Sequence, residues 1–268
     1  MPLLFLLFLF VHRYFIKISF DGSNYNGWQV QKNSSSTVQQ KINDGLSRLL
    51  NETIEVRGCC RTDAGVHAKE LFAQFDSQIN NLVIAGDRAW LYKFNSMLPL
   101  DISIDEIFSV TEKANARHDA IARTYQYFIH HKRNPFLINR SYYYYGELNV
   151  VLMNKAAKLL MKYEDFSAFS KLHTQVKTNR CVINKAKWEK NKDGNLVFTI
   201  RADRFLRGMV RMITGTMLQL GKNKMTLNDF KKIIESKDCR NAGALVPACG
   251  LYLTKVEYPP KYFSNNAR

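Results

Sequence analysis

The sequence predicts an α+β fold with a mainly antiparallel sheet. Segments with the two-residue alternation of strands and segments with helical apolar spacing follow one another without the regular order of a parallel βαβ sheet. A similar order of elements also returns in the second part of the chain. With 268 residues, of which 46% are hydrophobic, the chain can build a substantial core. We therefore expect two similar subdomains around one sheet.

The first subdomain is predicted to begin with a strand and a helix. Apolar and polar residues alternate over 14–20, which is typical of a half-buried strand. A capping box that begins at either Ser36 or Thr37 predicts the start of a helix. The apolar stripe of this helix consists of Val38, Ile42, Leu46 and Leu49. Residues 71–77 are then predicted to form a strand, and residues 87–98 a short helix.

The second subdomain is predicted to repeat this pattern. Residues 122–131 alternate in the manner of a long strand, with Tyr125, Tyr127 and Ile129 on one face. The remaining predicted elements are a helix at 151–163, a strand at 195–202, helices at about 205–220 and 227–236, and a final strand at 250–258.

The ends of the chain are expected to lie outside these subdomains. The predicted division is 1–12 as an apolar extension, 13–113 and 114–258 as the two subdomains, and 259–268 as a tail. The unbroken apolar run from Leu3 to Val11 is far below the ~20 residues that span a bilayer, and it lacks the features of a signal peptide. An upstream start codon assigned in error would account for it. We expect no membrane attachment, with a membrane-surface role as the alternative.

The charge of the chain favours an anionic partner. Lys and Arg outnumber Asp and Glu by 39 to 23, which gives a net charge of +16. Nucleic acid is the first candidate for such a partner. The alternative is solubility charge spread evenly over the surface.

The cysteines indicate a reducing compartment. There are five, an odd number, and no two have the C-x-x-C spacing. This argues against a disulfide framework or a zinc site. We expect buried free thiols, no metal and a cytoplasmic protein.

One carboxylate, Asp63, is surrounded by short side chains in the segment RGCCRTDAGVHAKE, residues 57–70. Gly65 supplies backbone freedom, and Arg61 could keep a nearby carboxylate ionised. Many loop aspartates instead bond to their own backbone in a turn. A catalytic and a purely structural Asp63 are both open from these residues.

Three arginines have helical spacing in RADRFLRGMVRMI, residues 201–213. If residues 205–220 are helical, Arg204, Arg207 and Arg211 share one face. We expect Arg204 and Arg207 to meet phosphates and Arg211 to reach inward to a carboxylate. An ordinary surface helix with adjoining basic and apolar stripes is the alternative.

Aromatic residues offer further candidates. Tyr125 on its predicted strand is typical of a core or sheet position, but an exposed aromatic beside Arg123 could stack on a base. The tyrosine-rich segment 141–146 has the same potential, with packing at a sheet edge as the simpler account. No ligand spacing is found among His67, His118 and His173. Gly-rich phosphate loops and Ser-His-Asp signatures are also missing from the sequence.

Five blocks together resemble the tRNA pseudouridine synthase A (TruA) family. They are DGSNYNGWQVQ (21–31), CRTDAGVHA (60–68), RTYQY (123–127), RFLRGMVRMI (204–213) and PACGLYL (247–253). The blocks occur in the family's order from about Tyr14 to Tyr258, nearly the whole chain. RTDAGVHA is highly specific by itself.

The resemblance implies that the chain converts uridine to pseudouridine at positions 38 to 40 of the tRNA anticodon stem-loop. This isomerisation requires no cofactor. The resemblance also implies a homodimer of two-subdomain chains, with the active site in a basic cleft between the subdomains.

The resemblance also implies roles for single residues. By position, Asp63 matches the catalytic aspartate, and Arg61 the arginine associated with flipping the target base. Tyr125 matches the active-site tyrosine, and Arg211 the arginine paired with the aspartate. The residues expected to bind the substrate are Arg61, Tyr125, Arg204, Arg207 and Leu251.

Two positions depart from the family pattern. Cys60 stands where a small residue, usually glycine, is common, which raises a question about the local backbone path. His118, in the block at 114–120, replaces a usual phenylalanine, and we expect altered packing behind Tyr125.

Overall fold

The computed structural model describes residues 11–31, 36–82, 88–171 and 178–263. Its strands are β1 (His12–Phe20), β2 (Arg57–Gly58), β3 (His67–Ser77), β4 (Ile102–Val110), β5 (Ala122–His130), β6 (Tyr142–Tyr143), β7 (Ile183–Lys190), β8 (Leu196–Ala202) and β9 (Leu251–Glu257). Its α-helices are α1 (Val38–Leu50), α2 (Ala89–Ser96), α3 (Val150–Leu160), α4 (Met209–Gly221) and α5 (Leu227–Ser236).

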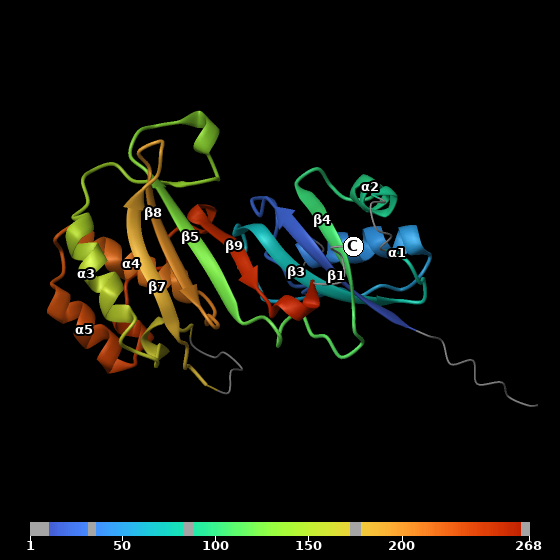
Figure 1. The fold of residues 1–268 in the computed structure, drawn as a ribbon. Coiled ribbons are helices and arrows are strands. Elements are labelled where there is room, and N and C mark those ends of the chain that lie inside the picture. The colour runs from blue at the N-terminus through green and yellow to red at the C-terminus, as the bar shows by residue number, and fades with distance from the viewer. Residues whose placement is uncertain (1–10, 32–35, 83–87, 172–177, 264–268) are drawn as a thin grey trace, which may run out of the picture.

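A single nine-stranded sheet runs through the described chain (Figure 1). Its main path is β4-β1-β3-β9-β5-β8-β7, while β2 pairs with β3 and β6 pairs with β5. Neighbours are antiparallel, apart from the parallel pairs β3–β9 and β5–β6. The predicted α+β class with a mainly antiparallel sheet is therefore confirmed.

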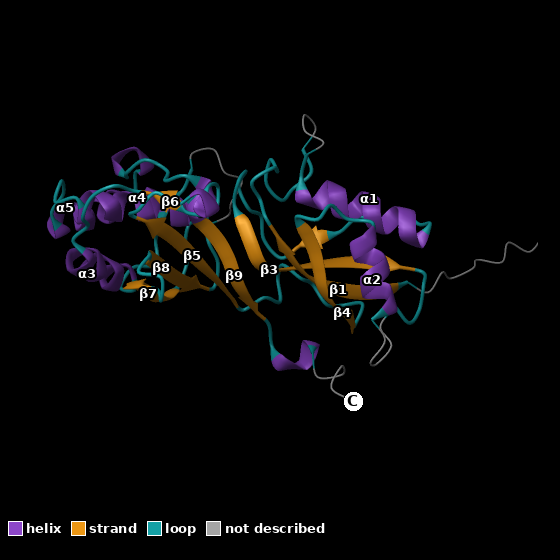
Figure 2. Ribbon diagram, turned by 90° about the horizontal axis from the view of Figure 1, so that it is seen from above, coloured by secondary structure: helices purple, strands orange, loops and turns teal. Residues whose placement is uncertain are grey.

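The two parts of the sheet come from different parts of the sequence. Strands β1, β3 and β4 precede β5, and all strands after β5 lie on its side of the sheet. The parts meet where β3 pairs with β9, through His67 with Tyr252 and Ala68 with Leu253. Figure 2 shows the strands as a continuous band with α1 and α2 at one end and α3 to α5 at the other. The boundary between 113 and 114 stays a prediction.

The predicted strand alternation in β5 is confirmed. Tyr125, Tyr127 and Ile129 are buried, while Gln126 and Phe128 are half-buried. Their burial follows because β5 lies inside the sheet, between β8 and β9, and directs alternate side chains to opposite faces.

Helix α1 resolves the alternative left open at its start. Thr37 is the N-cap, and its side chain accepts a hydrogen bond from the Gln40 backbone N–H at 3.3 Å. The Gln40 side chain binds Asp44 instead of returning to the cap. The buried stripe then ends at Leu50, with the predicted Leu49 only half-buried.

Helix α4 begins at Met209, four residues after the predicted start. Gly208 has φ +74°, in the left-handed region, so it cannot continue a right-handed helix toward the N-terminus. Arg204 and Arg207 therefore precede the helix, and the predicted common face with Arg211 is wrong. Helix α5, by contrast, has its predicted bounds.

The predicted extension at 1–12 lies outside the described residues, apart from its last two. Strand β1 already begins at His12. Among the described residues, no helix is long and apolar enough to cross a membrane.

Candidate active site

The Asp63 turn, residues 60–66, joins β2 to β3. Gly65 has φ +75°, which the reversal of the chain requires and which a side chain would disfavour. Its N–H donates to the Tyr25 carbonyl oxygen at 3.2 Å. The Trp28 N–H donates to the Thr62 carbonyl oxygen at 3.2 Å. These two hydrogen bonds therefore connect the block at 21–31 to the Asp63 turn.

Arg211 in the first turn of α4 is paired with Asp63. The Arg211 Nη1 lies 3.1 Å from Asp63 Oδ2, and Arg211 Nε donates to the Val246 carbonyl oxygen at 2.8 Å. The Asp63 and Arg211 side chains are only 19% and 15% exposed. The guanidinium is thus fixed by two acceptors and offers a charge-assisted bond to a largely buried carboxylate. The fold brings together residues 148 positions apart.

An arginine cluster (Arg61, Arg117 and Arg207) adjoins this pair. Arg207 Nε lies 3.9 Å from Asp63 Oδ1, and the Arg207 side chain is 70% exposed. Burial lowers the pKa of Arg61, and the positive charges of Arg117 and Arg207 lower it further. Three cations held this close repel one another, so a polyanion would be attracted to them. Arg117 was not among the residues expected from the motifs, although it stands beside His118 in a block that the family resemblance covers.

Tyr125 is buried, with 7% of its surface exposed, so the structure differs from the idea of an open stacking surface. Its ring meets the Phe205 ring edge-on, with 5.2 Å between centroids. Its hydroxyl lies 3.9 Å from Cys60 Sγ. Burial raises its pKa well above the ordinary value, so the hydroxyl stays protonated. Tyr125 therefore packs against Cys60, the first residue of the Asp63 turn.

Arg123 is a structural residue and not a surface cation. Its side chain is buried, and its guanidinium donates only to backbone carbonyl groups among the described residues. The acceptors are Ala120 at 2.7 Å, Asp203 at 2.8 Å, Cys59 at 3.1 Å and Arg117 at 2.7 Å. These bonds tie the end of β2, the turn at 114–120 and the segment before α4 to one another.

The two departures from the family pattern have simple structural outcomes. Cys60 does not have a positive φ, so its backbone path accepts a side chain without strain. Its sulfur lies 3.8 Å from that of Cys59. His118 is exposed, and Phe205 with Cys60 packs around Tyr125 instead. The effect of His118 on packing behind Tyr125 stays a prediction.

The structure does not bring Arg204 or Leu251 into polar contact with Asp63. Arg204 lies near Cys181: burial raises the pKa of that thiol to about 12, and the Arg204 charge opposes the rise. Leu251 is buried at the start of β9. Within the described chain, neither forms a hydrogen bond or ion pair with Asp63.

His67, the first residue of β3, connects the Asp63 turn to the other part of the sheet. Its Nε2 lies 3.2 Å from the Cys249 carbonyl oxygen. Its Nδ1 lies 3.1 Å from the Gly22 backbone nitrogen and 3.1 Å from Asp21 Oδ1. The ring stacks on Tyr252 with 4.4 Å between centroids. The sequence predicted no ligand role for His67, and its partners lie too far along the chain to be read from spacing.

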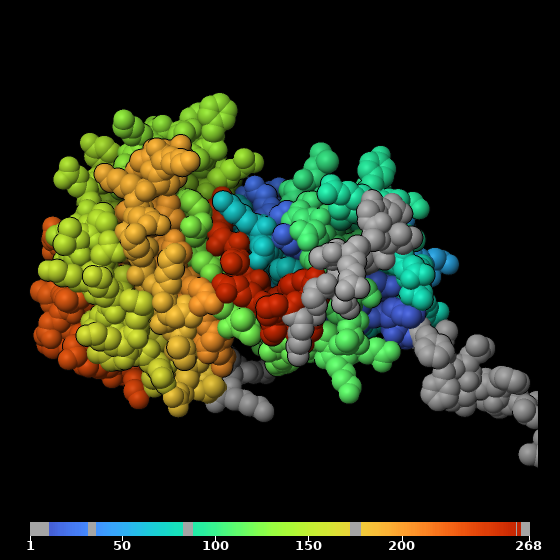
Figure 3. Space-filling model, viewed as in Figure 1, coloured from blue at the N-terminus to red at the C-terminus, as the bar shows by residue number. Residues whose placement is uncertain are grey.

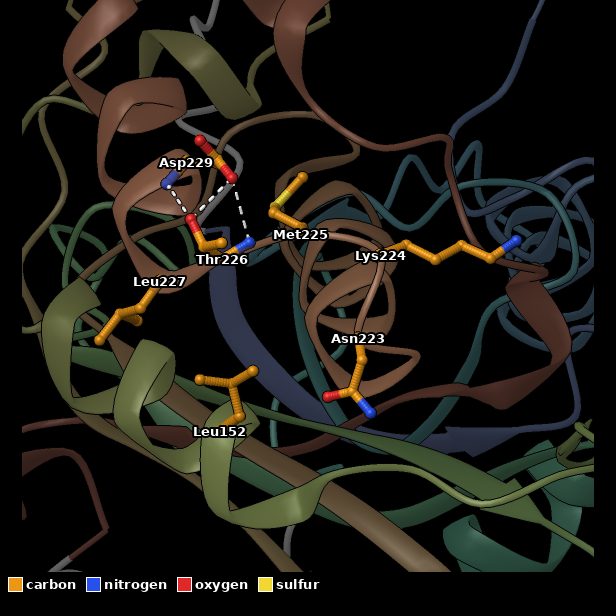
Figure 4. A pocket seen from close by; sticks show the side chains of 7 residues that line it. All are labelled: Leu152, Asn223, Lys224, Met225, Thr226, Leu227 and Asp229. Atoms are coloured by element: carbon orange, nitrogen blue, oxygen red, sulfur yellow. Dashed lines mark hydrogen bonds between the residues drawn. The ribbon is translucent and has the colours of Figure 1, made fainter.

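A separate hollow of about 490 Å³ lies between α3 and the start of α5 (Figure 4). It is lined by Leu152, Asn223, Lys224, Met225, Thr226, Leu227 and Asp229. Its carboxylate serves the helix: Asp229 and Thr226 form the capping box of α5. The hollow therefore does not compete with Asp63 as a reactive site. In the described part of the chain, no group of three or more His, Cys, Asp or Glu residues could hold a metal ion.

The fold and this site define a class of protein. An arginine-paired, largely buried aspartate offers a charged group for chemistry, and the adjoining arginine cluster on a chain of net charge +16 suits a phosphate backbone. This combination suits an enzyme that acts on a nucleic acid.

Comparison with known proteins narrows the class. A family model described as tRNA pseudouridine synthase matches residues 156–259. A tRNA pseudouridine synthase A from Bacteroides thetaiotaomicron is 47% identical, with 96% of this chain and 95% of that protein covered. The protein of the same name from Azobacteroides pseudotrichonymphae is 46% identical, with 95% and 100% covered. One from Clostridium acetobutylicum is 39% identical, with 91% and 98% covered.

The chain therefore belongs to the tRNA pseudouridine synthase A family, and it is an isomerase that acts on tRNA. A solved dye-decolorizing protein from V. cholerae aligns with 81% of this chain and 88% of its own, at 12% identity and a TM-score of 0.22, and gives no support for a shared fold.

Proposed function

We propose that the enzyme converts uridine to pseudouridine at positions 38, 39 and 40 of the tRNA anticodon stem-loop, with Asp63 as its catalytic carboxylate. The observation that carries this proposal is the 3.1 Å pair between Arg211 and Asp63. Family membership supplies the reaction, and the pair supplies a residue suited to it.

The reaction needs a charged group at its centre. The bond from ribose C1′ to uracil N1 breaks, the uracil turns, and C1′ joins C5, so the overall change is an isomerisation. An ionised carboxylate can serve by attacking C1′, by attacking the base or by removing a proton. The Arg211 Nη1 lies 3.1 Å from Asp63 Oδ2, so the guanidinium can hold the carboxylate by a charge-assisted hydrogen bond.

The target base must leave the RNA stack before Asp63 can reach it. Arg61 follows Cys60 in the Asp63 turn and is exposed, which supports a role in filling the space that the flipped base leaves. Arg207, with its 70% exposed side chain, is placed to meet a phosphate beside the carboxylate. Tyr125 is buried and protonated, and its hydroxyl lies 3.9 Å from Cys60 Sγ, at the first residue of the Asp63 turn.

The substitution Asp63→Asn tests this function. It keeps the shape of the side chain and removes its charge, so we expect loss of pseudouridine at positions 38 to 40 with tRNA binding retained. Pseudouridine would be mapped in total RNA from a deletion strain that carries either the original gene or the variant. Asp193→Asn, in the exposed β7–β8 hairpin, is the matched control and should restore all three positions. Restoration by Asp63→Asn would exclude the catalytic role, and unmodified positions in the complemented strain would exclude the target.

Two further parts of the proposal concern the assembly and its location. We place the enzyme in the cytoplasm, because its five cysteines form no disulfide among the described residues and tRNA is its substrate. We also expect a homodimer, as the family resemblance implies. Light scattering on the purified protein would test this assembly directly.

A further inference from the structure

The β5–β6 loop, residues 131–141, projects beyond one end of the sheet (Figure 1). In the space-filling view it forms the yellow-green projection at the top of the molecule (Figure 3). Nothing in the proposed chemistry of Asp63 uses this loop.

The loop holds apolar side chains in solvent. Phe136 is 85% exposed and Ile138 is 67% exposed. Local structure holds this arrangement, because residues 135–137 form a short 3₁₀ turn and the Asn134 side chain accepts from the Phe136 N–H at 2.9 Å. Exposed apolar groups in a built turn are a feature of binding surfaces.

The base of the loop is fixed to residues that also support the Asp63 turn. The Tyr252 hydroxyl donates to the Arg140 carbonyl oxygen at 2.7 Å. Arg140 Nε lies 3.6 Å from Asp21 Oδ2, and Asp21 Oδ1 lies 3.1 Å from His67 Nδ1. Tyr252 also stacks on His67. His67 follows Asp63 by four residues, so the loop base and the Asp63 turn belong to one connected framework.

The charge of the loop favours RNA as its partner. Residues 131–141 contain Lys132, Arg133 and Arg140 and no acidic residue. Arg140 is engaged at the base, whereas Lys132 and Arg133 are exposed and precede the exposed Phe136 by four and three residues. An exposed ring and two exposed cations in one short loop can together stack on an unpaired base and neutralise phosphates. A symmetric contact between two copies of this loop would instead place Lys132 and Arg133 against the same cations of the second copy.

We propose that the β5–β6 loop is a tRNA-binding element, in which Phe136 stacks on an unpaired base and Lys132 with Arg133 contact phosphates. This inference rests on the proposed function, because it concerns the same tRNA. The loop touches no reacting atom, so it contributes to binding and not to the chemical step.

The test compares turnover of full-length tRNA by Phe136→Ala and Phe136→Tyr. We expect Phe136→Ala to raise KM by about fivefold or more with kcat unchanged, since stacking on one base contributes at least that much. Phe136→Tyr keeps a ring and should retain the original KM. Tyr92→Ala removes a 78% exposed aromatic residue from α2 and is the matched control without effect.

A second measurement uses the double variant Lys132→Ala with Arg133→Ala. The slope of log affinity against log salt should become shallower by about one for each phosphate that the variant no longer neutralises. An unchanged KM for Phe136→Ala together with an unchanged salt slope would overturn the inference about the loop. The proposed function would still stand if these variants formed pseudouridine at positions 38 to 40. Light scattering of Phe136→Ala tests the alternative that the loop forms a dimer contact. Loss of a dimer with unchanged tRNA affinity of the subunits would assign the loop to self-association and refute RNA binding.

Discussion

At the scale of single residues, the site depends on how one guanidinium is held. Arg211 binds Asp63 through Nη1 and the Val246 carbonyl through Nε, so both its charge and its planar geometry are used. Sequence spacing indicated that Arg211 would reach a carboxylate, but the second acceptor could not be predicted. The Val246 carbonyl is a backbone group 35 positions away, and its orientation leaves no trace in residue type.

Substitution of Arg211 should separate the effect of its charge from that of its geometry. We expect Arg211→Ala to lower kcat by about tenfold to hundredfold, because Asp63 loses the charge-assisted hydrogen bond that holds its side chain. Arg211→Lys restores a cation without the second donor and should recover part of the loss. Single-turnover kinetics with saturating enzyme would measure the chemical step, and tRNA affinity would be measured separately.

The control for this prediction is Arg240→Ala. Arg240 is 79% exposed and paired with Asp238, away from Asp63. If Arg211→Ala had the same kcat as Arg240→Ala, the pair between Arg211 and Asp63 would have no role in the chemical step.

At the scale of elements, the sequence predicted those strands and helices whose apolar pattern is unbroken. Strand β4 was missed because its register shifts where Lys17 and Ile18 of β1 pair with it, which interrupts the alternation. Strand β7 was missed because it is a sheet edge, where lysines replace apolar residues on the exposed face. The late start of α4 was missed because helical spacing continues through Gly208, whose backbone conformation the spacing does not encode.

Gly208 thus determines where α4 begins, and its replacement tests that role. Gly208→Ala forces a side chain into a conformation with φ +74° and places Cβ 3.3 Å from Leu245 Cδ2. We expect the free energy of unfolding to fall by about 1–2 kcal/mol. We also expect kcat to fall, since Arg211 lies three residues later in the first turn of α4. Urea denaturation and turnover assays would measure the two effects.

Gly194→Ala provides the matched comparison. Gly194 has φ +76° in the β7–β8 hairpin, and among the described residues no heavy atom beyond its chain neighbours lies within 4 Å of the position that a Cβ would take. Gly194→Ala should lower the free energy of unfolding, because an alanine is strained at this φ, but it should leave turnover unchanged. Equal turnover in the two variants would mean that Gly208 does not position Arg211.

At the scale of the whole molecule, the two parts of the sheet share a narrow junction. Strands β3 and β9 pair through two residue pairs, and His67 adds the hydrogen bond to Cys249 across the same junction. Asp63 precedes His67 by four residues on one side, while Val246, the acceptor of Arg211, precedes β9 on the other. The geometry of the site therefore depends on a junction whose buried imidazole can titrate.

The titration of His67 predicts how stability depends on pH. Burial lowers the pKa of His67, and the nearby Asp21 carboxylate opposes this without cancelling it. The unfolded chain, with an ordinary histidine pKa of about 6.5, then binds the proton more tightly than the folded chain. The contribution of neutral His67 to the free energy of unfolding is therefore fully present above about pH 6.5 and is lost as the pH drops toward the folded-state pKa. The loss is about 1.4 kcal/mol for each unit of difference between the folded and unfolded pKa.

Replacement of His67 by glutamine should make this pH dependence shallower. The amide of His67→Gln can still donate to the Cys249 carbonyl, but it does not titrate. Urea denaturation of both proteins between pH 5 and 8 would measure the difference. The pKa of His130 is also lowered by burial, yet His130 is present in both proteins, so its contribution cancels in the comparison. Parallel pH profiles would show that protonation of His67 does not weaken the junction, and the junction would then owe its stability to the strand pairing and the stacking on Tyr252.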